Sequence, residues 1–118
     1  MLLRIWLGLL CAVVVVSLLP GRALPAVPVS DNVAHGAAYL ALAALPVARA
    51  ARPWAAAAGA LLLAPLGLLL EVAQMAIPGR GFEWRDAAAN VAGVMAGMAL
   101  GWLARLVWRP DADLRIPL

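Results

Sequence analysis

The chain has 118 residues, of which 66% are hydrophobic and 13% charged, and its formal net charge is +3 at pH 7. Its mean hydropathy of +0.96 lies far outside the range of soluble globular domains. The composition therefore excludes an ordinary soluble domain and predicts an integral membrane protein.

Four apolar stretches, taken in chain order, predict an all-α fold: an integral membrane bundle of four transmembrane helices in a single domain over residues 1–118. A helix needs about 20 residues to cross the hydrocarbon core of a bilayer. We expect the helices at about residues 3–19, 32–48, 54–77 and 86–108, followed by a C-terminal tail at 109–118.

The first stretch also has features of a cleaved signal peptide, namely a basic start, an apolar core and small residues after it. Its apolar core of about 15 residues is long for such a signal. The segment ALPAV that follows is a poor cleavage site because it contains a proline. We therefore expect a retained span, with cleavage as the alternative. Cys11 is the only cysteine, so no intrachain disulfide can form.

Prolines mark the predicted helix boundaries. Pro53 suits the first turn of the third helix, and Pro78-Gly79 is typical of a helix end. Pro65 lies inside the third helix, where it predicts a kink and leaves the carbonyl of Leu61 without its usual donor.

Arginines alone set the predicted orientation, because the chain contains no lysine. With the N-terminus in the cytoplasm, the arginines that fall inside are Arg4, Arg49, Arg52, Arg105, Arg109 and Arg115, and those outside are Arg22, Arg80 and Arg85. This excess predicts that both termini are cytoplasmic. The net charge reflects this bias, so we expect no nucleic-acid partner. Abundant Ala, Arg, Gly and Pro without lysine indicates a bacterial protein, so a multi-pass protein of the bacterial inner (cytoplasmic) membrane is expected.

Polar side chains gather toward the predicted outer ends of the last three helices. They share faces at spacings of three or four residues: Asp31, His35 and Tyr39, then Glu71 and Gln74, then Asp86 and Asn90. A carboxylate within a membrane helix costs on the order of 2.5–3.5 kcal/mol, so such a group usually finds a partner. We expect these residues to form one pocket just below the outer surface. The available donors for Glu71 are His35, Gln74, Asn90 and Arg80.

Several of these residues also have a simpler, purely structural interpretation. Asp31 and Asp86 begin helices and are candidate N-caps. Gln74 and Asn90 are candidates for plain interhelical hydrogen bonding. The spacing of Gly93, Gly97 and Gly101 predicts close helix packing. The tryptophans, at positions 6, 54, 84, 102 and 108, are expected mainly as anchors at the membrane interface.

The combined motifs resemble the VanZ-like family of small bacterial membrane proteins. The resemblance lies in DNVAHGAAY, LEVAQ, an arginine and DAAANVAGVMAG, and covers about residues 30 to 101. It falls on Asp31, His35, Tyr39, Glu71, Gln74, Arg80, Asp86, Asn90, Gly93 and Gly97. The family is named after a member associated with resistance to the glycopeptide teicoplanin, and the resemblance implies no particular reaction. The loop GFEW between Arg80 and Asp86 departs from the family pattern by being more acidic and aromatic.

Three functions follow from this pocket. The favoured hypothesis is an outward-facing site that binds the head group of an envelope lipid or a glycopeptide, with Arg80 contacting an anion. A membrane-embedded hydrolase or transferase using His35 and carboxylates is an alternative, although no serine or cysteine is placed as a nucleophile. A small proton-coupled transporter and a purely structural polar network remain further alternatives. Membrane lipids are the expected partners, and neither a metal nor a cofactor is expected.

Overall fold

The computed structural model describes residues 1–108, which fold into five α-helices. These are α1 (Leu2–Ser17), α2 (Asp31–Arg49), α3 (Pro53–Leu61), α4 (Leu63–Gln74) and α5 (Trp84–Val107), with a 3₁₀ turn, η1, at Gly21–Ala23. No β-strand occurs in this part of the chain, so the all-α prediction is confirmed. The expected tail at 109–118, with Arg109 and Arg115, lies outside the described residues.

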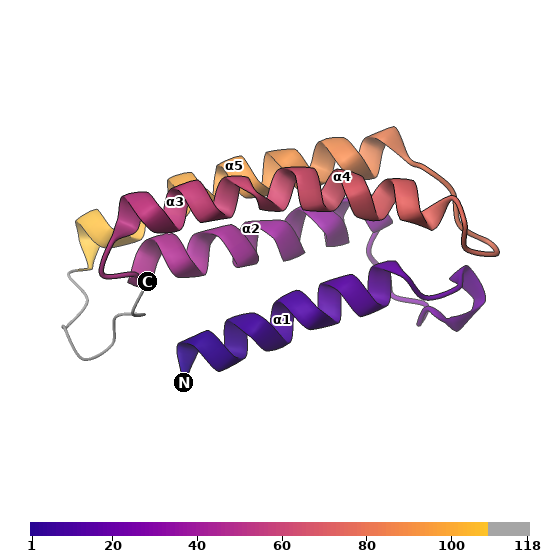
Figure 1. Ribbon diagram of the computed structural model, residues 1–118, viewed down its shortest axis with the longest axis horizontal. Coiled ribbons are helices and arrows are strands. Elements are labelled where there is room, and N and C mark those ends of the chain that lie inside the picture. The colour runs from indigo at the N-terminus through magenta and orange to yellow at the C-terminus, as the bar shows by residue number, and fades with distance from the viewer. Residues whose placement is uncertain (109–118) are drawn as a thin grey trace.

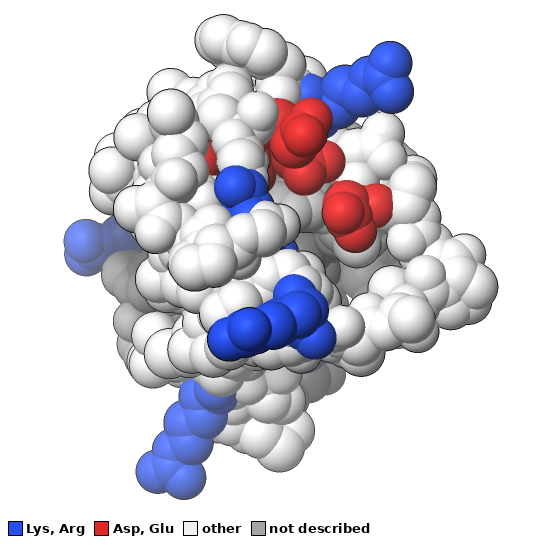
Figure 2. All heavy atoms as spheres, turned by 90° about the vertical axis from the view of Figure 1, so that its right-hand side faces the viewer, with Lys and Arg blue, Asp and Glu red and all other residues white. Residues whose placement is uncertain are grey.

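The helices alternate in direction, and α3 continues into α4 as one rod (Figure 1). The C-terminal ends of α1 and α4 therefore lie at the same end of the bundle as the first turns of α2 and α5. This end holds every carboxylate of residues 1–108, namely Asp31, Glu71, Glu83 and Asp86, and we call it the acidic end. Figure 2 views the molecule from this side, with acidic side chains grouped among arginines.

Two helical rods, Pro53–Gln74 and Trp84–Val107, are long and apolar enough to cross a membrane. α1 is apolar but has only 16 residues. α2 has 19 residues but begins with the polar residues Asp31, Asn32 and His35 and does not meet the same standard. The sequence prediction of four spans is thus supported for two helices.

At Pro65 the structure has a break between α3 and α4, at Leu62, where the sequence predicted a kink. Pro65 has no N–H to donate to the carbonyl of Leu61, four residues earlier, so the regular helical ladder is interrupted just there. The amide of Leu62 instead reaches the carbonyl of Gly59, a tighter bond over three residues. The helix resumes immediately, and the rod keeps its direction (Figure 1).

Two helices end two or three residues earlier than predicted, and prolines explain both differences. α1 ends at Ser17 instead of residue 19, because Pro20 disfavours helical geometry in the residue before it. α4 ends at Gln74 instead of residue 77, since Pro78 has no N–H for the carbonyl of Gln74. The amide of Ile77 takes that carbonyl in a bond over three residues, which tightens the turn.

α2 and α5 form the most extensive helix pair, and glycines bring their backbones together. A methyl group added at Gly93 or Gly97 would overlap the carbonyl oxygen of Gly36 or Leu40 on α2. At Gly101 the added carbon would lie 2.8 Å from the carbonyl oxygen of Ala44. The predicted close packing on this glycine stripe is confirmed, and α2 is its partner.

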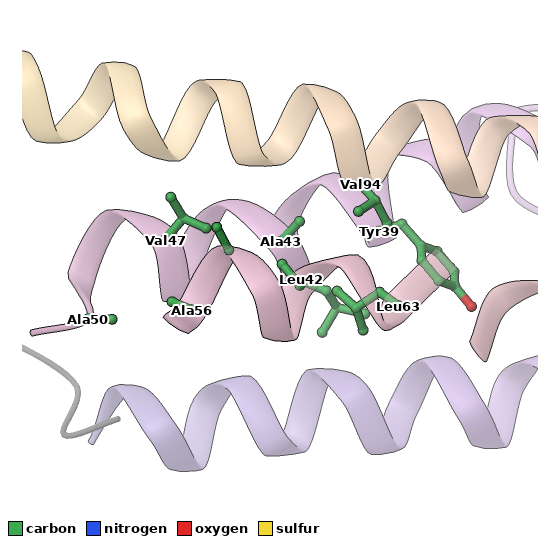
Figure 3. Close-up of a cluster of buried hydrophobic side chains, with 10 residues drawn as sticks. Tyr39, Leu42, Ala43, Val47, Ala50, Ala56, Leu63 and Val94 are labelled. Carbon is green, nitrogen blue, oxygen red and sulfur yellow. The ribbon is translucent and has the colours of Figure 1, made fainter. Parts of the chain in front are cut away.

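A core of buried apolar side chains fills the space between α2, the α3–α4 rod and α5 (Figure 3). Leu42 and Val47 of α2 are completely buried, and Val94 of α5 packs in the same cluster. Tyr39 belongs to this core as well, at the side nearest the acidic end. Small residues such as Ala43 and Ala56 allow the helices to approach closely.

The tryptophans divide into two groups. Trp54, Trp84 and Trp108 are about three-quarters exposed, as interface anchors would be, although the Trp54 ring also packs against that of Trp102 at 4.6 Å between centroids. Trp6, by contrast, is turned into the bundle, and its indole N–H donates to the carbonyl of Leu42 at 2.8 Å. The interpretation of Trp6 as mainly an interface anchor is therefore wrong.

Candidate functional site

His35 lies between two carboxylates that come from different helices. Its Nδ1 is 3.7 Å from Glu71 Oε1, and its Nε2 is 3.7 Å from Asp86 Oδ2. α2, α4 and α5 each supply one of these residues, all within a turn or two of the acidic end. We call His35, Glu71 and Asp86 the histidine cluster. The expected convergence of three helices on one polar site is thus present.

Asn90 orients the imidazole of His35. The two side chains meet at 3.0 Å between Nδ1 and Oδ1, so the Nδ1–H donates to the amide oxygen. Asn90 is 1% exposed, and Gly67 of α4 leaves room for it, since a carbon added there would lie 3.0 Å from the Asn90 amide nitrogen. With Nδ1 engaged by Asn90, Nε2 is the ring nitrogen that faces Asp86.

Glu71 is buried, with 1% of its surface exposed, and only one of its oxygens is satisfied. Oε2 accepts a hydrogen bond of 3.2 Å from the backbone N–H of Glu83, in the loop before α5. Oε1, which faces His35, has no hydrogen-bond partner among the described residues. The expected donors Gln74 and Arg80 do not bond to it. The backbone donor from Glu83 could not be foreseen, because it depends on the path of the loop.

Two predicted site residues lie outside the histidine cluster. Gln74 donates through its amide nitrogen to the carbonyl of Ser17 at 3.0 Å, which fastens α4 to the end of α1. Its role is therefore the plain interhelical bond considered from the sequence. Tyr39 is 2% exposed and packs in the apolar core, with one ring edge against Gly67.

Neither predicted aspartate N-cap is found. Ser30 occupies the N-cap of α2 and Glu83 that of α5, and neither Asp31 nor Asp86 makes a capping hydrogen bond. α5 begins two residues earlier than expected, so Asp86 lies inside its first turn. There its negative charge still suits the positive end of the helix dipole, while its carboxylate faces His35.

A cavity of about 310 Å³ opens beside the cluster, between α1 and α2. Its polar lining is Ser17, Asp31, His35 and Arg80, and its apolar lining comprises Ala12, Val13, Val16, Leu24, Pro25, Val27, Ala34 and Ala38. Asp31 and Arg80 thus join the site through the cavity and not through the cluster. Arg80 makes no ion pair within residues 1–108.

The contribution of the first helix to this cavity was not predicted. Ala12, Val13 and Val16 are apolar residues in an apolar helix, so nothing in the sequence distinguishes them from their neighbours. The α1–α2 linker and the α4–α5 loop are held together by a close contact between Gly21 and Gly79. A carbon added to Gly21 would lie 2.8 Å from the Gly79 carbonyl oxygen. Gly79 has a φ of 76°, which favours glycine, and this turn brings Arg80 beside the α1–α2 linker.

The chain matches no protein-family model, and comparison with curated proteins and with solved structures finds no match. The functional argument therefore depends on the residues of the site.

Proposed function

We propose that the chain is a VanZ-like integral membrane protein that binds the anionic head group of an envelope lipid, or of a related amphiphile, in the cavity at the acidic end. In this proposal it contributes to cell-envelope or glycopeptide resistance of the teicoplanin type. The observation that carries the proposal is the cavity itself, which combines an apolar wall with the unpaired guanidinium of Arg80.

The surface of the molecule supports a position within a membrane. Large apolar side chains are exposed along the outer faces of three rods, including Ile5 on α1, Leu69 on α4 and Leu103 on α5. The end opposite the acidic end carries only basic charges among residues 1–108, namely Arg4, Arg49, Arg52 and Arg105. By the positive-inside rule this end faces the cytoplasm of a bacterial cell, so the acidic end faces outward in a four-span arrangement.

The cavity suits a molecule with one charged and one apolar part. Phosphate or carboxylate would receive charge-assisted hydrogen bonds from Arg80, and the first segment of a hydrocarbon chain would contact Val13, Val16 and Leu24. Asp31 and His35 line the same cavity and add polar contacts for the remainder of a head group. A site of this size encloses a head group and the start of a chain, while the rest of the chain lies in the bilayer.

A binding measurement with a simple amphiphile tests the proposal. We expect purified protein in a neutral detergent to bind dodecyl phosphate but not uncharged dodecanol. Replacement Arg80→Gln should weaken that binding at least tenfold, because hydrogen bonds to charged groups are each worth about 1.5–3 kcal/mol.

Arg22→Gln is the matched control, because it removes the same charge from the same end of the molecule at an exposed residue outside the cavity. Equal affinities for the Arg80→Gln and Arg22→Gln proteins would contradict the proposal, as would equal binding of dodecanol and its phosphate.

The proposed role in resistance is measured in cells. Survival of a sensitive bacterium under teicoplanin should rise on expression of the wild-type chain and return to the background level with Arg80→Gln or Glu71→Gln at equal abundance. Full protection by both variants would refute a role for this site in resistance.

Hydrolysis or group transfer is a second candidate, favoured by the placement of His35 between two carboxylates at the cavity wall. A histidine held by carboxylates can act as a general base toward water. This activity predicts release of phosphate from polyprenyl phosphates, or of the head group from phospholipids, by the purified protein, and its loss on His35→Gln. Absence of turnover across these substrates would eliminate it. The position of Glu71 near the end of its rod does not favour a transporter, whose coupling site belongs near the membrane midplane.

A further inference from the structure

The negative charges of the histidine cluster are not balanced by its own residues. One ligand atom from each of His35, Glu71 and Asp86 can be chosen so that all three lie within 4.8 Å of one another. With a neutral imidazole the cluster carries two negative charges, and no basic side chain lies within ion-pair distance of either carboxylate apart from the imidazole, among residues 1–108.

Glu71 supplies the second observation. Its side chain is 1% exposed, and Oε1, the oxygen that faces the imidazole, has no hydrogen-bond partner in the described chain. A buried carboxylate oxygen without a partner carries an uncompensated loss of hydration. An additional positive group between Glu71, His35 and Asp86 would remove that deficit.

From these observations we infer that His35, Glu71 and Asp86 bind a divalent metal ion of the zinc class. One imidazole nitrogen and two carboxylate oxygens form a three-ligand set typical of sites that keep a further position open for water or another ligand. The ion's two charges would balance the two carboxylates.

The distances and the surroundings fit such an ion. Zinc bonds of about 2.0–2.2 Å at tetrahedral angles separate neighbouring ligand atoms by about 3.4 Å. Because Asn90 engages Nδ1, Nε2 is the ring nitrogen left for the ion, and it lies 3.7 Å from Asp86 Oδ2. The three ligand atoms lie within 4.8 Å of one another, so binding requires the carboxylates to move inward by about 1 Å. Asn90 holds the Nδ1–H, as an outer partner of a metal-binding histidine commonly does, and the backbone N–H of Glu83 holds the second oxygen of Glu71. His35 also lines the cavity, which gives the ion a path of entry.

The test measures metal retention by the purified full-length chain, carried on a tag without histidine. The protein is stripped with EDTA, dialysed against dilute Zn²⁺ and analysed for bound zinc. We expect one zinc per chain, and less than a tenth of that in Glu71→Gln and Asp86→Asn. Glu83→Gln is the matched control, because it makes the same chemical change at an exposed residue two positions after Gly81, outside the cluster, and it should retain zinc like wild type.

A second measurement uses the wild-type protein, so it does not depend on whether the variants fold. His35 is the only histidine of the chain, so the ring nitrogens of protein labelled with ¹⁵N-histidine give the signals of a single imidazole. Zinc should move the signal of one ring nitrogen strongly in wild type and in Glu83→Gln, and EDTA should reverse the change. Unchanged ring signals in wild-type protein, or equal zinc retention by Glu71→Gln and Glu83→Gln, would overturn the inference. Binding of dodecyl phosphate is measured in EDTA, so failure of the lipid proposal is recognised separately.

Discussion

Trp6 shows how a single side chain can repair the consequence of a single proline. Pro46 lies within α2 and has no N–H for the carbonyl of Leu42, four residues before it. The indole N–H of Trp6 donates to that carbonyl instead, from the neighbouring helix. Because Leu42 is completely buried, water cannot easily serve as the partner.

The residue-scale prediction is that Trp6 and Pro46 are energetically coupled. Trp6→Phe should lower the free energy of unfolding in detergent by about 1 kcal/mol or more, since it removes the donor and leaves the carbonyl unsatisfied. In a Pro46→Ala background the helix regains its own donor, so Trp6→Phe should cost clearly less. Unfolding curves of the four proteins in this double-mutant cycle measure the coupling. The same loss in both backgrounds would contradict this explanation.

The candidate site was predictable from the sequence to the extent that regular helices project side chains at fixed intervals. Pairs of polar residues three or four apart occur in α2, α4 and α5, so the polar faces of these helices were expected to meet. The pairs are Asp31 with His35, Glu71 with Gln74 and Asp86 with Asn90. The sequence could not show that Gln74 and Glu71 have different partners. Gln74 bonds to the carbonyl of Ser17, so its partner depends on where α1 ends. The sequence also could not supply the backbone donor of Glu83, since a loop's path has no periodic signature.

At the scale of whole helices, the pairing of α2 with α5 depends on a surface without side chains. Gly93, Gly97 and Gly101 face the backbone of α2 over two turns, so the two helices contact each other closely along their length. Arg105 of the same helix donates to the carbonyls of Val47, Ala48 and Ala50 at 2.9–3.2 Å. It thereby satisfies acceptors at the C-terminal end of α2, where a positive charge is also favourable.

We therefore predict that Gly97→Ala destabilises the bundle although alanine is the better helix former. The added methyl group would overlap the carbonyl oxygen of Leu40, and separating the helices should cost about 1–3 kcal/mol. Gly59→Ala in α3 is the matched control, because nothing lies within 4 Å of the added carbon. The control should be neutral or more stable by up to about 1 kcal/mol. Thermal unfolding in detergent measures both, and similar midpoints for the two variants would refute the packing explanation.

The order of the apolar segments was predictable because each is separated from the next by prolines, glycines or charges. The number of helices was not, since the predicted third helix is divided into α3 and α4 at Leu62. Helix ends were predicted less well. Hydropathy marks where apolar residues stop, whereas the last hydrogen bond of α1 or α4 depends on the proline that follows. The glycine stripe of α5 predicted a close neighbour but left open which helix it would be, and the structure shows that α2 contacts α1, α3 and α5.

For the molecule as a whole, charge is divided between the two ends of the bundle. Within residues 1–108, Asp31, Glu71, Glu83 and Asp86 all lie at the acidic end, whereas Arg4, Arg49, Arg52 and Arg105 lie at the opposite end without any acidic residue. Arg22, Arg80 and Arg85 accompany the carboxylates, so only the opposite end has an unopposed positive charge. This division is the physical basis for the proposed orientation.

Orientation can be measured with single cysteines in a Cys11→Ser background. Gly81→Cys places a thiol in the exposed loop at the acidic end, and Ala51→Cys places one in the exposed turn at the other end. Neither change alters an arginine. A membrane-impermeant maleimide should label the first variant in intact bacterial cells and the second only after permeabilisation. The reverse pattern would show that the cavity opens to the cytoplasm.

α1 is attached to the rest of the bundle by few contacts. Of its residues only Ser17 is buried, and just two side-chain hydrogen bonds within residues 1–108 fasten it, from Trp6 to Leu42 and from Gln74 to Ser17. The glycine contacts leave α2 and α5 no comparable freedom. If the proposed amphiphile enters the cavity from the side of the bilayer, we expect α1 to be the wall that moves, because one hydrogen bond near each of its ends holds it while α2 and α5 stay packed together.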